Sequence, residues 1–80
     1  MDFDVEYEKN KIRQILIECR NEKGITQSEL GKVIGKSKTA IASWEQGLSM
    51  PDAVTLYRLA LYYEKTLAYM YGEKEKNDDN

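Results

Sequence analysis

The sequence predicts an all-α fold, a compact bundle of about five helices. Three observations lead to this prediction. The chain has 80 residues, which allows one domain with a small core. Apolar residues recur at helical spacing in successive segments. Residues that start helices and glycines that end them alternate along the chain, so each segment is separated from the next by a short turn.

Residues 1–8 alternate acidic and apolar side chains, and the acids are Asp2, Asp4, Glu6 and Glu8. This pattern is consistent with an extended acidic arm. It is equally consistent with the first turn of the first helix, where the helix dipole favours acids. Four carboxylates would be repelled by phosphate groups, so an arm here is expected to pack on the domain or contact a dimer partner.

The first full helix is predicted from about Lys9 to Glu22, because its apolar residues follow an i, i+3, i+4, i+7 pattern and Gly24 can end it. These apolar residues are Ile12, Ile15, Leu16 and Cys19. Cys19 is expected to be a small core residue rather than a nucleophile, since the sequence offers no base to activate its thiol.

The second helix has a strong start signal. Thr26 can cap it while Glu29, three residues on, reaches back to the backbone N–H of Thr26. Leu30, Val33 and Ile34 then form an apolar face, and Gly35 tolerates the left-handed conformation that ends a helix.

The third helix follows almost at once, with Ser37 as its cap and Gly47 at its end. Its apolar face consists of Ala40, Ile41 and Trp44, which leaves outward Lys38, Thr39, Ala42, Ser43 and Gln46. These outward side chains are short or hydrogen-bonding, with one cation and no acid. Such a face can enter a DNA major groove and bond base edges or phosphates. An ordinary solvated helix face would give the same pattern.

Two further helices are predicted toward the C-terminus. Asp52 can cap a fourth helix whose apolar stripe is Leu56, Leu59, Ala60 and Tyr63. Thr66 can cap a short fifth helix, which carries Leu67, Met70 and Tyr71 and ends at Gly72. Residues 73–80 are polar or charged and are expected to be disordered, so the domain is assigned to residues 9–72.

The order of these signals resembles the phage repressor and Cro type of helix-turn-helix regulators, also called the xenobiotic response element family, from about Ile12 to Gly72. The resemblance implies a lambda-repressor-like DNA-binding domain in which the second and third helices form the helix-turn-helix. The residues that carry it are Gly24, Ile25, Thr26, Gln27, Glu29, Leu30, Val33, Ile34, Gly35, Ser37, Ile41, Trp44, Glu45, Gly47, Pro51, Leu56, Leu59 and Ala60.

The resemblance also implies roles for particular side chains. Lys38, Thr39 and Ser43 occupy positions where the family places base-reading side chains, whereas Gln27 and Ser37 should mainly hold the phosphate backbone. Arg20 and Glu45 match positions that form a partly buried ion pair in some phage repressors. The alternative is that they are two separate surface charges, which would contribute little to stability.

One segment departs from the family pattern. The loop after the third helix reads Leu48, Ser49 and Met50, where relatives often carry Lys, Arg or Asn that bond phosphates. This departure removes expected backbone contacts, and Leu48 and Met50 are expected instead to pack on a neighbour.

The last two helices are rich in tyrosine, namely Tyr57, Tyr62, Tyr63, Tyr69 and Tyr71. One small core cannot hide this much aromatic surface, so some rings should face outward. Family members often dimerise through this region, and exposed tyrosines are enriched at interfaces. We therefore predict a homodimer interface that includes Tyr62 and Tyr69. Scattered surface tyrosines are the alternative.

Composition limits the function. There are 12 basic and 14 acidic residues, a net charge of −2 and no histidine, with a single cysteine. These counts exclude an internal disulfide and histidine-based catalysis, and no metal, cofactor, small-molecule substrate or enzyme activity is expected. The acidic balance is unusual for a nucleic-acid binder, but residues 27–50 hold three basic and two acidic residues. No apolar run is long enough for a membrane span, so a cytoplasmic location is expected.

The sequence therefore predicts a sequence-specific transcriptional regulator that binds double-stranded DNA and acts by occupying an operator as a dimer. The alternative is a protein-interaction or antitoxin-like module that keeps the fold with weak or no DNA binding. The acidic balance and the non-basic loop after Gly47 favour this alternative.

Overall fold

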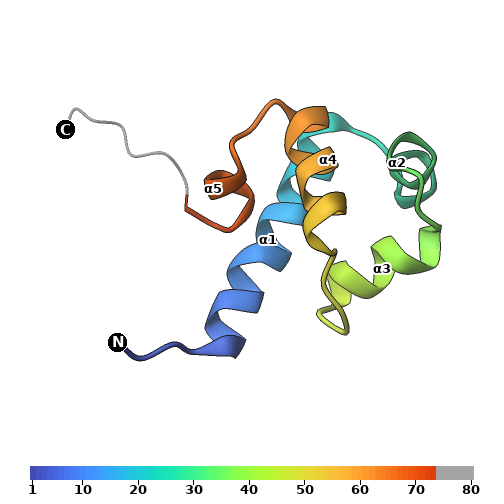
Figure 1. Ribbon diagram of the computed structural model, residues 1–80. Coiled ribbons are helices and arrows are strands. Elements are labelled where there is room, and N and C mark those ends of the chain that lie inside the picture. Colours follow the sequence, from blue (N-terminus) through green and yellow to red (C-terminus); the bar gives the residue numbers. More distant parts are fainter. Residues whose placement is uncertain (74–80) are drawn as a thin grey trace.

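The computed structural model describes residues 1–73 and is all-helical over that range (Figure 1), which confirms the predicted fold class. Residues 74–80, most of the predicted disordered tail, lie outside the described residues. The helices are α1 (Val5–Lys23), α2 (Gln27–Ile34), α3 (Lys38–Gln46), α4 (Ala53–Tyr63) and α5 (Leu67–Met70).

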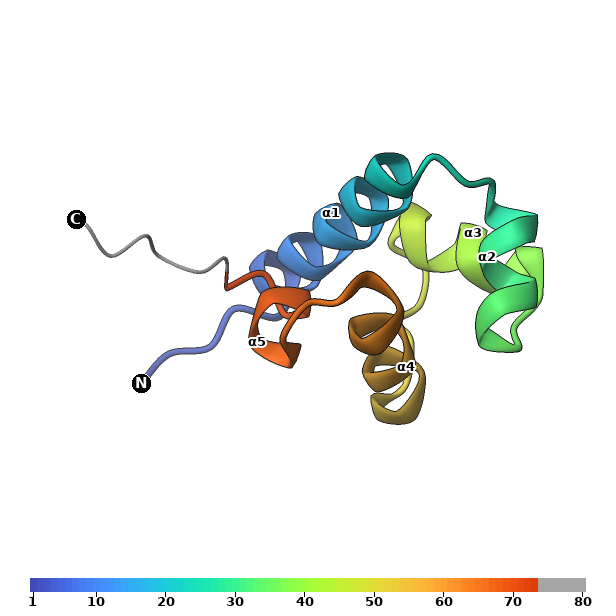
Figure 2. The same ribbon diagram turned by 90° about the horizontal axis from the view of Figure 1, so that it is seen from above.

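Helix α1 begins earlier than the apolar stripe predicted. Asp4 caps it, because its carboxylate accepts a hydrogen bond from the Tyr7 backbone N–H at 3.1 Å. Residues 5–8 are therefore the first turn of α1, and residues 1–4 extend away from the body of the molecule (Figures 1 and 2). The apolar stripe did not predict this turn, because Val5 and Tyr7 are 62% and 61% exposed and do not belong to the core.

All five helices contribute to one core. Leu59 and Met70 are fully buried within it, and the α1 stripe supplies three members. The buried apolar residues are Ile15, Leu16, Cys19, Leu30, Ile34, Ile41, Trp44, Leu56, Leu59, Ala60, Tyr63 and Met70.

Three residues predicted to lie on apolar faces are instead substantially exposed. Val33 is 53% exposed, because the buried side of the short helix α2 is formed by Leu30, Gly31 and Ile34. Leu67 and Tyr71 are 40% and 45% exposed, because α5 is a single turn that buries only Met70 among its residues.

The turn between α2 and α3 is tight enough to require a glycine inside α2. Gly31 is buried, and a Cβ atom at this position would meet the backbone carbonyl oxygen of Lys36. The Lys36 N–H in turn donates to the Gly31 carbonyl at 2.8 Å. Gly35 completes the turn with φ 76°, a conformation that favours glycine. This close contact holds α3 against α2 at one end of the molecule (Figure 2).

The C-terminal segment folds back on α1. Lys11 Nζ forms an ion pair with Glu73 at 2.8 Å. Gly72 adopts φ 94°, and a Cβ there would lie 2.7 Å from the Lys11 Cβ, so glycine is required both for conformation and for space. Helix α5 is thereby placed beside α1 rather than beside the helix-turn-helix (Figure 1).

Candidate nucleic-acid interface

The outward face of α3 is polar and free of acids in its first turn. Lys38, Thr39 and Gln46 are exposed and Ser43 is half-buried, while Ile41 and Trp44 anchor the opposite side of the helix in the core. Because the N-terminal end of a helix carries a partial positive charge, this end of α3 suits contact with a polyanion.

Ser37 fixes the start of α3. Its hydroxyl oxygen accepts a hydrogen bond from the Ala40 N–H at 3.1 Å, and the residue itself is exposed. A serine hydroxyl can donate one hydrogen bond while it accepts others, so the Ser37 O–H hydrogen can still be donated outward to a phosphate.

Ser43 has a partner that the sequence analysis did not anticipate. Its Oγ lies 2.7 Å from the Oγ of Ser49, in the loop that follows α3. The Leu48 N–H also donates to the Ser43 carbonyl at 2.9 Å. This loop therefore folds back toward the outward side of the helix. The only sequence signal was the pair of hydroxyl residues flanking Gly47.

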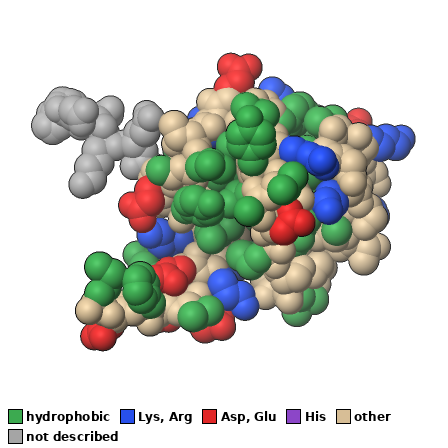
Figure 3. Space-filling model, in the orientation of Figure 1, with side chains coloured by type: hydrophobic (Ala, Val, Ile, Leu, Met, Phe, Trp, Pro, Cys, Tyr) green, Lys and Arg blue, Asp and Glu red, His purple; other side chains and the backbone are tan. Residues whose placement is uncertain are grey.

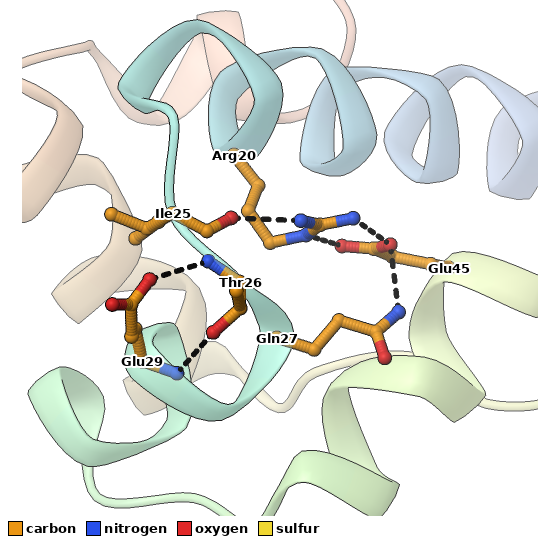
Figure 4. Close-up of polar contacts among 6 residues, drawn as sticks. All are labelled: Arg20, Ile25, Thr26, Gln27, Glu29 and Glu45. Carbon is orange, nitrogen blue, oxygen red and sulfur yellow. Dashed lines mark hydrogen bonds and ion pairs between the residues drawn. The ribbon is translucent and has the colours of Figure 1, made fainter.

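Arg20 and Glu45 lie together between the end of α1 and the end of α3 (Figure 4). Arg20 Nε is 2.6 Å from Glu45 Oε2, and Nη2 is 2.9 Å from Oε1, so the guanidinium grips both carboxylate oxygens. Arg20 Nη1 also donates to the Ile25 carbonyl at 2.8 Å. The hydrogen bond with Glu45 raises the pKa of Arg20 above its usual value.

This pair is largely shielded from water, since the Arg20 and Glu45 side chains are 17% and 9% exposed. It joins three elements at once: α1, the segment before α2, and α3. The capping box that starts α2 lies beside it, with Thr26 N–H donating to Glu29 at 2.8 Å and Glu29 N–H donating to Thr26 at 3.0 Å (Figure 4). The orientation of α3 relative to the start of α2 is thus set by charge-assisted hydrogen bonds.

Gln27 is tied into the same group. Its side-chain amide donates to Glu45 Oε1 at 3.1 Å (Figure 4), and the residue is half-buried. One amide hydrogen is committed to this bond, and the second is left to be donated elsewhere. Glu45 therefore orients the side chain that the sequence analysis assigned to the phosphate backbone.

Positive charge gathers where the α2–α3 turn meets α4, with Lys36 in the turn and Arg58 on α4. Arg58 Nη1 donates to the Ile34 carbonyl at 3.2 Å, at the C-terminal end of α2. The pKa of the Asp52 carboxyl is lowered, chiefly by the hydrogen bond from the Thr55 N–H and further by the charges of Lys36 and Arg58. The loop after Gly47, by contrast, supplies no cation.

The two tyrosines predicted for a dimer interface are less exposed than expected. Tyr62 and Tyr69 are half-buried against the core, and a lysine Nζ lies over each ring, that of Lys23 at 4.8 Å and that of Lys65 at 4.6 Å. The larger apolar side chains that face outward from α4 and beyond are Val54, Tyr57, Leu61, Leu67 and Tyr71. Figure 3 shows hydrophobic side chains gathered on the face where α4 and α5 lie.

Other kinds of site find little support in the described part of the chain. Residues 1–73 contain no group of three or more histidine, cysteine, aspartate or glutamate side chains that could hold a metal ion. Within the same range, no helix combines the length and apolar character needed to cross a membrane.

Comparison with known proteins gives two findings. A family model described as helix-turn-helix matches residues 16–70, more than half of the chain. The chain is also similar to the solution structure of the SOS-response transcriptional repressor LexA from Eubacterium rectale. The TM-score is 0.82 and the sequence identity 25%, over 100% of this chain and 83% of that chain. No curated protein matches the sequence.

Proposed function

The chain belongs to the helix-turn-helix family of DNA-binding transcription regulators, and we propose that it recognises a specific operator and acts by occupying it. The observation that carries this proposal is the outward face of α3, which is polar, free of acids at its start, and held rigidly by the Arg20–Glu45 pair. A rigid helix that presents short hydrogen-bonding side chains is suited to reading base edges in the major groove.

We assign base reading to Lys38, Thr39 and Ser43, and backbone contact to Gln27 and Ser37. The net charge of −2 supports this division, because a chain whose acidic and basic residues nearly cancel gains little affinity from its overall charge. Discrimination between sequences must then come mainly from the base contacts of α3.

Replacing Thr39 with alanine tests this assignment. We expect the affinity for the preferred duplex to fall by about 1–3 kcal/mol, with little change for random duplex, because base contacts carry the discrimination. Fluorescence anisotropy titrations with both duplexes measure the two affinities. Gln14→Ala, at an exposed position on α1, is the control and should change neither. Equal losses on both duplexes would reassign Thr39 to the phosphate backbone.

We further propose that the regulator binds as a homodimer through its C-terminal helices, with Tyr62 and Tyr69 in the interface. The large outward apolar residues of α4, which are Val54, Tyr57 and Leu61, recur at i, i+3 and i+7 and support this proposal. A two-fold dimer would read two half-sites about one helical turn of DNA apart.

A charged substitution at Tyr69 tests the dimer. Tyr69→Glu should shift the sedimentation of the protein toward monomer, because a carboxylate would have to lose its water in the interface. Tyr7→Glu is the matched control, since Tyr7 is an exposed tyrosine on α1. Circular dichroism at the same concentration shows whether both variants stay folded. A wild-type protein that is monomeric at high micromolar concentration rules out this dimer in free solution.

A second candidate function is a protein-interaction or antitoxin-like module. It is favoured by an open apolar groove of about 360 Å³ between the start of α1, the loop before α4, and Tyr71. Its lining residues are Val5, Glu8, Lys9, Ile12, Met50, Pro51, Ala53, Leu56 and Tyr71. If selection from a random duplex pool enriches no sequence, and the chain binds a protein through this groove, the second function is the correct one.

A further inference from the structure

The hydrogen bond between Ser43 and Ser49 joins a side chain assigned to base reading with one outside α3. We propose that Ser49 is a positioning residue, which holds the Ser43 side chain in one χ1 rotamer for contact with DNA. The inference rests on the proposed function, because it concerns how a base-reading side chain is prepared for its contact.

The backbone around Ser49 is restrained on both sides. Gly47 ends α3 in the left-handed conformation with φ 81°, and its N–H and that of Leu48 are bonded to the last turn of the helix. On the other side, Pro51 leads into α4, whose cap is Asp52. Ser49 therefore lies in a short loop fixed at both ends, and its hydroxyl meets that of Ser43 at 2.7 Å without a long flexible side chain.

The Ser43 hydroxyl has a competing partner if Ser49 does not hold it. A serine inside a helix can donate to the carbonyl four residues earlier, which for Ser43 is that of Thr39. That bond would turn the hydroxyl hydrogen back along the helix. The contact with Ser49 holds the Ser43 Oγ at the loop after α3 instead, which leaves either its hydrogen or a lone pair for a base edge.

Because Ser49 holds the Ser43 side chain before DNA is bound, the entropy lost on binding is smaller. A side chain that is already oriented loses less rotational freedom when it contacts its target. Because either hydroxyl can be the donor, the pair can offer a base either a hydrogen or a lone pair at Ser43. The benefit should appear only where Ser43 contacts a base, and therefore only on the preferred sequence.

The experiment combines Ser49→Ala with Ser43→Ala and with Thr39→Ala, and measures binding to the preferred and to random duplex. Ser49→Ala alone should weaken binding to the preferred duplex by about three- to tenfold, as expected for loss of one hydrogen bond, and leave random duplex nearly unchanged. The same loss should occur in the Thr39→Ala protein and disappear in the Ser43→Ala protein. Ser49→Thr, which keeps the hydroxyl, should restore most of the binding.

An equal loss in the Ser43→Ala protein would overturn the inference, because Ser49 would then act on DNA by itself. A second measurement needs no DNA. The Hα–Hβ coupling constants of Ser43 in the free protein should indicate one χ1 rotamer in the wild type and averaging in Ser49→Ala. Averaging in the wild type would overturn the inference even if the protein selects a DNA site. If the Ser43 rotamer is fixed but the protein selects no DNA site, the contact between Ser43 and Ser49 is real and the proposed DNA-reading function is wrong.

Discussion

Replacing Arg20 with methionine is expected to lower the free energy of unfolding by about 3 kcal/mol, near the lower end of the range for breaking a buried ion pair. The cost arises because Glu45, with a side chain only 9% exposed, would lose the guanidinium that binds both its oxygens. The Ile25 carbonyl would lose its bond from Arg20 as well. Urea unfolding followed by circular dichroism measures the change.

A double replacement measures the interaction between Arg20 and Glu45 apart from the other effects of each single replacement. Arg20→Met together with Glu45→Met should cost much less than the sum of the two single replacements, since no unpaired charge is left behind. Lys11→Met is the control, because it breaks the exposed Lys11–Glu73 pair and should have a far smaller effect. Additive single effects in the cycle would show that Arg20 and Glu45 do not depend on each other.

Gly31→Ala is expected to destabilise the protein by about 1–3 kcal/mol, the usual range for adding a methyl group to a closely packed site. The new Cβ would meet the Lys36 carbonyl oxygen. It would also lie 3.4 Å from the Ile41 Cδ1. The turn between α2 and α3 would have to open, which also displaces the start of α3.

The sign of this effect is diagnostic. In a helix without this contact, alanine is more stable than glycine by about 0.5–1 kcal/mol. A Gly31→Ala protein at least as stable as the wild type in urea would therefore mean that the turn is not as close as the structure has it. Loss of stability together with loss of site preference would link the turn to the placement of α3.

The fold could be predicted because its signals are local. Thr26, Ser37, Asp52 and Thr66 each accept a hydrogen bond from the backbone three residues on, as their side chains indicated. The misplaced features depend on neighbours that a periodic pattern cannot identify. Val33 falls on the predicted stripe, yet none of the helices within residues 1–73 buries it, and it stays 53% exposed.

The candidate site was only partly predictable for a related reason. The outward face of α3 follows from its cap and its buried residues alone. The bonds of Gln27 to Glu45 and of Ser43 to Ser49 are created by the turns that bring separate segments together. Tyr62 and Tyr69 illustrate the limit, because tyrosine content predicts outward rings without indicating which ones the core half-covers. Their role in a dimer remains a proposal.

The central claim is that α3 reads a DNA sequence, and selection from a random duplex pool at low salt tests it most directly. The wild-type protein should enrich a defined motif. Binding as a dimer further predicts two inverted half-sites about one helical turn apart. The same selection with a protein that carries both Thr39→Ala and Ser43→Ala should lose preference at the positions those side chains read. A wild-type pool with no enriched sequence, or a preference unchanged by the double replacement, would show that α3 does not read DNA through these side chains.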